Sequence, residues 1–254
     1  MKADFSELVY EAVDGCAWIT LNRPKSLNAF TVKMYQELKA SVRLAQEDQS
    51  VELAVITGAG TAFSAGNDIF EMHELLNSDS DPLAFYRFED ALPFGMIASV
   101  QKPLIAAVNG VCSGGGLLLA LVCDFAFAAA SATFGIPEAR VGMAGTLLPV
   151  ALAGRVRPDQ VKYLAFTGDH VDAVTARNIG LVLDVVPDDR LMPRVREVVA
   201  AVRQTEPTAR ARYKELVNAL LPALPYQSYF PLKTPQLAEG LRSYVERRPR
   251  GRSG

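Results

Sequence analysis

Hydrophobic and polar positions change their period several times along the first 130 residues. Loose alternation predicts two strands, at residues 8–13 and 16–21, joined at the turn pair Asp14-Gly15. Continuous apolar runs predict three buried parallel strands, at residues 53–57, 103–108 and 125–129. Between them, helical spacing predicts a helix over residues 31–46 with Thr31 as its N-cap. Because strands alternate with helices, the pattern predicts an α/β fold built from parallel βαβ units.

The rest of the chain is mostly helical in pattern. Further helices are predicted from Glu71 onward and over residues 83–100, 117–122, 159–166 and 174–180. A short strand is predicted at residues 182–186, and helical spacing runs from Leu191 to the end. We place a boundary near Pro187, between an α/β core (residues 1–187) and a C-terminal helical region (residues 188–254). That region is too short to bury much by itself, so we expect it to pack on the core or on a neighbouring subunit.

Composition and charge narrow the class of protein. The chain has 254 residues, of which 50% are hydrophobic and 21% charged, and this balance excludes a disordered chain. A formal net charge of -2 argues against nucleic-acid binding, which needs a basic surface. No apolar run reaches the roughly 20 residues of a membrane helix, and the first ten residues do not resemble a secretory signal. Three cysteines without metal-ligand spacing, and only two histidines, predict a reduced cytoplasmic protein without a metal site.

Two segments share the order buried strand, glycine turn and helix. They run from Val55 to Met72 and from Ile105 to Asp124. Each turn presents backbone N–H groups at a helix start, and glycine lets a ligand approach that backbone closely. Two such turns side by side would form an oxyanion hole for a carbonyl oxygen. Neither turn matches a dinucleotide-binding or P-loop pattern.

Five motifs, in order and spacing, resemble the crotonase superfamily, the enoyl-CoA hydratase/isomerase family. They are ITLNRPKSLNAF (19–30), AFSAGNDI (62–69), KPLIAAVNGVCSGGG (102–116), CDFAFAAASATFGIPEARVG (123–142) and TGDHVDAVTARNIGLVLDVVP (167–187). The resemblance covers nearly the whole chain. It implies a spiral of ββα units, acyl-CoA thioester substrates and a homotrimer or hexamer with C-terminal helices at the subunit contacts. No metal or redox cofactor is implied, since CoA is part of the substrate.

The resemblance also assigns site residues. It places the two oxyanion N–H groups on Asn67 and Gly115. Hydratases of the family use two glutamates, and the matching positions here are Leu118 and Glu138. Two carboxylates can hold a water between them, whereas one can shuttle a proton. A single Glu138 resembles the mitochondrial-type Δ3,Δ2-enoyl-CoA isomerases and favours a double-bond shift. The FSAGND loop also resembles peroxisomal isomerases, but the position of their base holds Thr146 here.

Other readings stay open from the sequence. A hydratase, decarboxylase or other lyase would need a second group in place of the missing glutamate. The candidates for it are His73, Glu71, Glu74, Glu89 and Asp90. A protein that binds acyl-CoA without catalysis is a further alternative. Asp68 and Asp124 are expected to be structural, and His170 is expected in a polar turn.

The family resemblance places the CoA moiety along two segments. The residues it implies are Lys25, Leu27 and Ala29 in the first segment, and Ala65 and Ile69 in the second. Lys25 and the later Arg242 and Arg247 are candidates for pairing with phosphates. Aromatic residues between positions 85 and 94, together with Met96, are expected to form either core or a wall of the acyl pocket.

Overall fold

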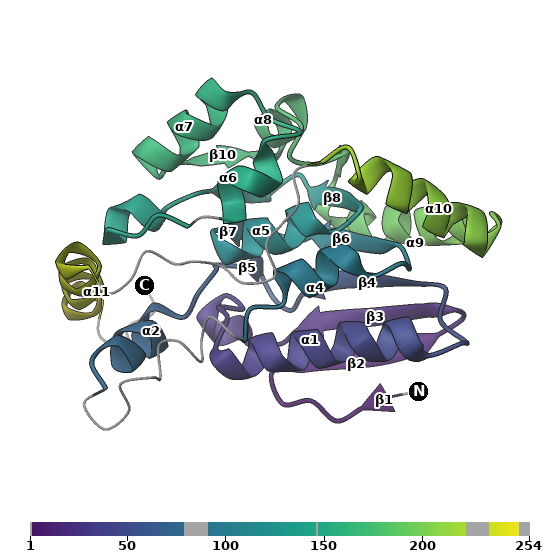
Figure 1. Cartoon of the computed structure of the whole chain (residues 1–254), viewed down its shortest axis with the longest axis horizontal. Helices are drawn as coiled ribbons and strands as arrows, with labels where there is room; N and C mark the ends of the chain where they lie inside the picture. The colour runs from purple at the N-terminus through teal and green to yellow at the C-terminus, as the bar shows by residue number, and fades with distance from the viewer. Residues whose placement is uncertain (1, 79–90, 146, 222–233, 249–254) are drawn as a thin grey trace.

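The computed structural model describes residues 2–78, 91–145, 147–221 and 234–248, and its core holds two β-sheets (Figure 1). The larger sheet has the strand order β1 (Lys2–Ala3), β2 (Leu8–Val13), β3 (Cys16–Leu21), β4 (Leu53–Gly58), β6 (Leu104–Val108), β8 (Phe125–Ala129) and β11 (Asp184–Val186). The smaller sheet has the order β10 (His170–Asp172), β9 (Thr133–Gly135), β7 (Val111–Ser113) and β5 (Ala62–Ser64). Strands β3, β4, β6, β8 and β11 are parallel, which confirms the parallel core that the apolar runs predict.

Successive segments of the chain add one strand to each sheet. Strands β4, β6 and β8 enter the larger sheet, and each is followed by a strand of the smaller one, β5, β7 or β9. A helix then closes the unit: α2 (Ile69–Leu76) after β5, α5 (Gly115–Val122) after β7 and the 3₁₀ helix η2 (Glu138–Val141) after β9. This repetition is the ββα spiral expected from the family resemblance. It brings the start of each closing helix to the same side of the sheets.

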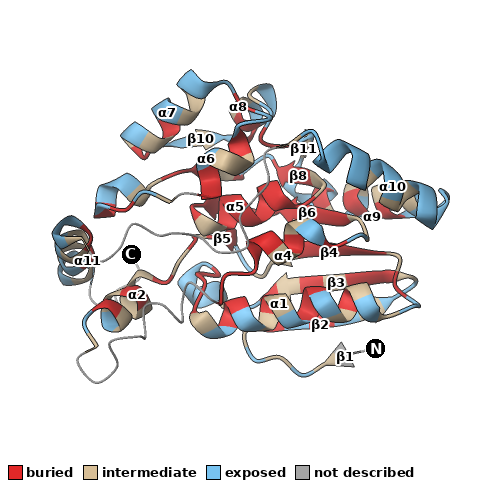
Figure 2. Ribbon diagram, in the orientation of Figure 1, coloured by how far each residue is buried: buried red, intermediate tan, exposed pale blue. Residues whose placement is uncertain are grey.

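The remaining helices lie around the two sheets. They are η1 (Pro24–Ser26), α1 (Val32–Glu47), α4 (Phe94–Ser99), α6 (Leu147–Leu152), α7 (Pro158–Thr167), α8 (Ala173–Asn178), η3 (Asp188–Arg190), α9 (Leu191–Arg203), α10 (Pro207–Asn218) and α11 (Pro235–Arg247). Helix α1 begins as predicted, since Thr31 Oγ1 accepts a hydrogen bond from Met34 N. Helix α5 is buried on nearly every side, whereas α10 is largely exposed (Figure 2).

Alternate residues of the central strands build two separate hydrophobic clusters. Ile56 and Ala106 face the large cluster that includes α1 and α5. Val55 and Ile105 face the opposite way and pack against the apolar face of α9. The start of the C-terminal region therefore packs on the core, which is one of the two arrangements expected from the sequence. The domain boundary near Pro187 stays a prediction.

Several sequence predictions needed correction. The prediction of one continuous helix over residues 83–100 is wrong, because Leu92 and Pro93 interrupt it and α4 covers only Phe94–Ser99. Residues 83–90 lie outside the described residues. His170 lies in strand β10 rather than in a turn, with its ring against Gly135. The sequence did not predict strands β5, β7, β9 and β10, because three-residue strands are too short to show a period. Helix α6 was also not predicted. No helix among the described residues is long and apolar enough to cross a membrane.

Candidate active site

The two glycine turns identified in the sequence lie against each other. Gly66 and Gly114 both have positive φ, of 89° and 52°, which residues with a Cβ rarely adopt. A Cβ placed on Gly66 would lie 3.1 Å from the backbone nitrogen of Gly115 and 2.9 Å from Ser113 O. Glycine at position 66 therefore allows the first turn to touch the second. Both turns stand at the start of a helix, α2 and α5.

Hydrogen bonds fix the first turn on both sides of Asn67. Phe30 N donates to Gly66 O at 2.7 Å, and Asp68 N donates to Phe30 O at 2.8 Å. Asp68 caps α2 by accepting from Phe70 N and Glu71 N. Its other oxygen pairs with the Arg23 guanidinium at 3.0 Å. Asp68 thus has the structural role that was expected.

The backbone N–H groups of Asn67 and Gly115 are available for a ligand. Among the hydrogen bonds between described residues, neither group has an acceptor. Gly115 is the first residue of α5, where an N–H group has no partner within the helix. The structure therefore brings together two N–H donors from adjacent turns, the arrangement that stabilises an oxyanion.

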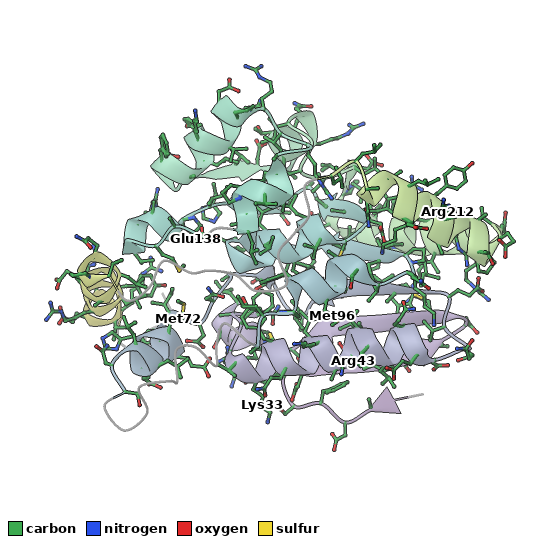
Figure 3. All side chains as sticks on the ribbon, viewed as in Figure 1. Lys33, Arg43, Met72, Met96, Glu138 and Arg212 are labelled. Carbon is green, nitrogen blue, oxygen red and sulfur yellow. The ribbon has the colours of Figure 1, made fainter. Side chains whose placement is uncertain are left out.

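Glu138 lies beside this pair of turns, at the start of η2 and near the start of α5 (Figure 3). A Cβ placed on Gly114 would lie 2.6 Å from Glu138 Oε1, so the carboxyl group packs directly over the second turn. Its Oε2 is buried and has no hydrogen-bond partner among the described residues. Burial raises the pKa of Glu138 to about 7, although a hydrogen bond from its own backbone N–H acts in the opposite direction. A carboxyl group with this pKa can both take and return a proton near neutral pH.

A small cavity of about 30 Å³ connects these groups. Its described lining residues are Tyr35, Asn67, Leu92, Phe94, Gly115, Leu118, Glu138, Met143, Gly145, Leu147 and Leu148. All three sequence-predicted catalytic residues, Asn67, Gly115 and Glu138, line it. Leu118 is 4% exposed and presents an apolar side chain to the same cavity. Glu138 is the one carboxylate among the described lining residues.

The sequence analysis missed one polar residue of this cavity, Tyr35. It occupies one of the apolar positions by which the helix at residues 31–46 was predicted, so its periodicity indicated only burial. The ring is fully buried and contacts Phe30 and Phe94, with centroid distances of 4.7 and 5.6 Å. Its hydroxyl donates to Asn67 Oδ1 at 2.5 Å. No sequence pattern gave a signal for this contact.

The five residues expected to hold CoA lie on two neighbouring segments. Ala65 N donates to Leu27 O at 2.9 Å, which joins the segment of Lys25, Leu27 and Ala29 to that of Ala65 and Ile69. Leu27 is 41% exposed and has a φ of 49°, so it projects from the surface in a left-handed conformation.

Asn28 anchors the first of these segments. Its side chain is fully buried and accepts from Arg23 N at 2.9 Å. Its Nδ2 donates to Ala59 O and Ala62 O, at 2.9 and 2.8 Å. The two bonds of Nδ2 hold residues 23–28 against the strand and turn that precede Ala65, and the bond from Arg23 N closes the segment on itself.

The other candidate residues lie apart from the cavity. His73 and Glu74 are on α2, and neither is among the described lining residues. Glu71 accepts from Val32 N at 2.9 Å and so helps to fix α1. Arg242 pairs with Glu239, and Arg247 donates to Ser243 O, both within α11. Glu89, Asp90, Thr146 and the aromatic residues at positions 85–88 lie outside the described residues. Asp124 is structural, since it accepts from Leu104 N and pairs with Lys214 at 2.8 Å.

Comparison with known proteins shows the family to which this chain belongs. The family profile described as enoyl-CoA hydratase/isomerase matches residues 11–251. A probable mitochondrial enoyl-CoA hydratase of Dictyostelium discoideum is 36% identical over 205 residues, which are 79% of this chain and 71% of the relative. A probable enoyl-CoA hydratase of Mycobacterium bovis is 34% identical over 242 residues, 91% of each chain. The crystal structure of an enoyl-CoA hydratase subunit from Geobacillus kaustophilus superposes with a TM-score of 0.79 at 32% identity, covering 86% of this chain and 83% of that one. The chain belongs to the enoyl-CoA hydratase/isomerase family of acyl-CoA enzymes.

Proposed function

We propose that this protein shifts a double bond between 3-enoyl-CoA and 2-enoyl-CoA, with Glu138 as the single acid and base. The observation that carries the proposal is the Glu138 carboxyl, whose buried Oε2 has no hydrogen-bond partner among the described residues. It lies beside the N–H groups of Asn67 and Gly115, which have no acceptor among those residues, and Leu118 occupies the position where the resemblance places a second carboxylate. One carboxyl suffices to move a proton between two carbons of the same chain.

The steps balance without a further reactant. Ionised Glu138 takes a proton from C2 of the 3-enoyl thioester. The electron pair of that C–H bond delocalises onto the thioester oxygen, which accepts hydrogen bonds from the N–H groups of Asn67 and Gly115. Protonated Glu138 then returns the proton to C4, and the double bond forms between C2 and C3. Because the donors bind the enolate more strongly than the neutral carbonyl, they lower the barrier, and the loss of one donor costs about 3 kcal/mol.

The CoA moiety is assigned to the two joined segments described above. Lys25, Leu27, Ala29, Ala65 and Ile69 are proposed to contact it, with CoA as part of the substrate and no separate cofactor. We also propose a homotrimer or hexamer through the C-terminal helices, which sedimentation of the purified protein would test.

Hydration of a 2-enoyl-CoA is the second candidate. It is supported by the two relatives described above, which are named as probable enoyl-CoA hydratases. Against it, the cavity offers Leu118 in place of the second water-holding carboxylate.

Product analysis separates the candidates. The protein is mixed with trans-3-hexenoyl-CoA and, separately, with trans-2-hexenoyl-CoA, and products are identified by NMR and mass spectrometry. We expect conversion of the 3-enoyl to the 2-enoyl substrate without hydration. Glu138→Gln should abolish conversion while CoA ligands still bind, and Glu197→Gln on the exposed face of α9 should not. A 3-hydroxyacyl product, or activity retained by Glu138→Gln, would refute the proposal.

A further inference from the structure

The side chain of Asn67 creates a problem for the oxyanion hole. Its Oδ1 lies 3.4 Å from the point where a Cβ on Gly115 would stand, and it belongs to the residue that carries the other N–H donor. Asparagine oxygens readily accept hydrogen bonds from nearby backbone N–H groups. An Oδ1 without another donor would compete with the thioester oxygen for these two groups.

Tyr35 supplies that other donor. Its hydroxyl donates to Asn67 Oδ1 at 2.5 Å and lies 2.9 Å from the same Cβ point on Gly115. The ring is held between Phe30 and Phe94, so the hydroxyl has little freedom to turn away. Burial, together with the nearby charge of Glu138, raises the pKa of Tyr35 well above its ordinary value. The phenol therefore stays protonated and remains a donor at any working pH.

We propose that Tyr35 is a positioning residue of this site, which holds the Asn67 side chain by its Oδ1 and so keeps the N–H groups of Asn67 and Gly115 open for the thioester oxygen. The inference rests on the oxyanion role in the proposed function, but not on which reaction follows. It assigns a function to a buried tyrosine that core packing alone does not require, since phenylalanine would fill the same space.

The proposal makes the effect of the hydroxyl depend on the Asn67 amide. Tyr35→Phe removes the hydroxyl and leaves Oδ1 to compete, so kcat/KM should fall about tenfold, the scale of one hydrogen bond. Asn67→Ala keeps the backbone N–H and removes the competing oxygen. In that background Tyr35→Phe should change kcat/KM by less than about twofold, since coupled residues depart from additivity.

A spectroscopic readout separates this proposal from the reaction itself. Butyryl-CoA labelled with ¹³C at the thioester carbonyl has no double bond to shift or hydrate. Infrared difference spectra of the bound ligand report hydrogen bonding to its oxygen through a shift of the carbonyl band to lower wavenumber. We expect Tyr35→Phe to reduce that shift by about half when Asn67 is present. In the Asn67→Ala background, adding Tyr35→Phe should not reduce the shift further.

Tyr10→Phe provides the matched control. Tyr10 is also a buried tyrosine, and its hydroxyl has no partner among the described residues. The substitution should leave both the carbonyl band and kcat/KM unchanged. The proposal would be overturned if Tyr35→Phe lowered kcat/KM equally with Asn67 present and in the Asn67→Ala background. An unchanged carbonyl band in Tyr35→Phe would also overturn it. A wild-type band that shifts without any isomerisation would refute only the proposed function.

Discussion

Glu138 should make the folded protein less stable at neutral and alkaline pH than it would be without this charge. Its pKa rises from 4.5 to about 7 on folding because burial disfavours the ionised form. Well below pH 4.5 the carboxyl is protonated in both the folded and the unfolded states, and it imposes no cost. Between pH 4.5 and 7 the unfolded state ionises first, so the free energy of unfolding falls over this window. One pKa unit corresponds to about 1.4 kcal/mol, so the full loss above pH 7 is about 3 kcal/mol.

Glu138→Gln removes this penalty while preserving the size of the side chain. At pH 8 the variant should be more stable than the wild type by about 3 kcal/mol, which for a chain of this length raises the melting temperature by about 5 to 10 °C. At pH 4.5, where the carboxyl of the unfolded state is half ionised, the two proteins should differ by less than about 0.5 kcal/mol. Urea unfolding followed by circular dichroism, from pH 4.5 to pH 8.5, gives the difference directly.

Glu37→Gln is a control with the opposite sign. Burial alone would raise the pKa of Glu37, but hydrogen bonds from Ser6 and Glu7 lower it overall. Its ionised form therefore stabilises the fold above the unfolded pKa, and this stability is lost as pH falls. The variant should be less stable than the wild type at pH 8. A Glu138→Gln difference that is independent of pH, or that matches the sign of Glu37→Gln, would refute the reasoning.

Three further predictions follow from the same site. The kcat/KM for isomerisation should rise with pH to a plateau with an apparent pKa of about 7, because Glu138 must be ionised to take the C2 proton; a flat profile from pH 5 to 9 would contradict this. Gly114→Ala should cost activity as well as about 1–3 kcal/mol of stability. Gly15→Ala, at a residue that also has a positive φ of 71° but is remote from the site, should cost stability alone; both are checked by melting curves and kinetics. Leu118→Glu should add hydration of trans-2-hexenoyl-CoA, seen as a 3-hydroxyacyl product, while Leu118→Gln should not; equal hydration by both would show that the carboxylate is not what is missing.

Sequence patterns located the parts of the fold in which local signals agree with long-range packing. The hairpin at Asp14-Gly15 has positive φ at both residues, as the turn pair predicts. Thr31 caps its helix through a local hydrogen bond. These features depend on residues close together in the chain, and so a single sequence reveals them.

Local sequence patterns could not predict the smaller sheet or the polar side of the cavity. Strands β5, β7 and β9 have three residues each and are held by pairing with segments about 20 to 50 residues away. Tyr35 and Asn67 are separated by 32 residues, and only the tertiary fold brings their side chains together. Glu138 was found because a motif surrounds it, but its burial and raised pKa follow from neighbours in space.

The bonds of Asn28 have a consequence for ligand association. Residues 23–28 are already held in place, so under the proposed placement of CoA its long, flexible chain would meet a surface that does not have to order itself. Immobilising a rotamer-rich side chain on binding costs about 0.5–1.5 kcal/mol, and a preorganised segment avoids much of this conformational entropy. In the proposed arrangement, recognition of CoA by this segment is separate from proton transfer at Glu138. Substitutions in the acyl cavity would then alter the reaction without changing the segment proposed to bind CoA.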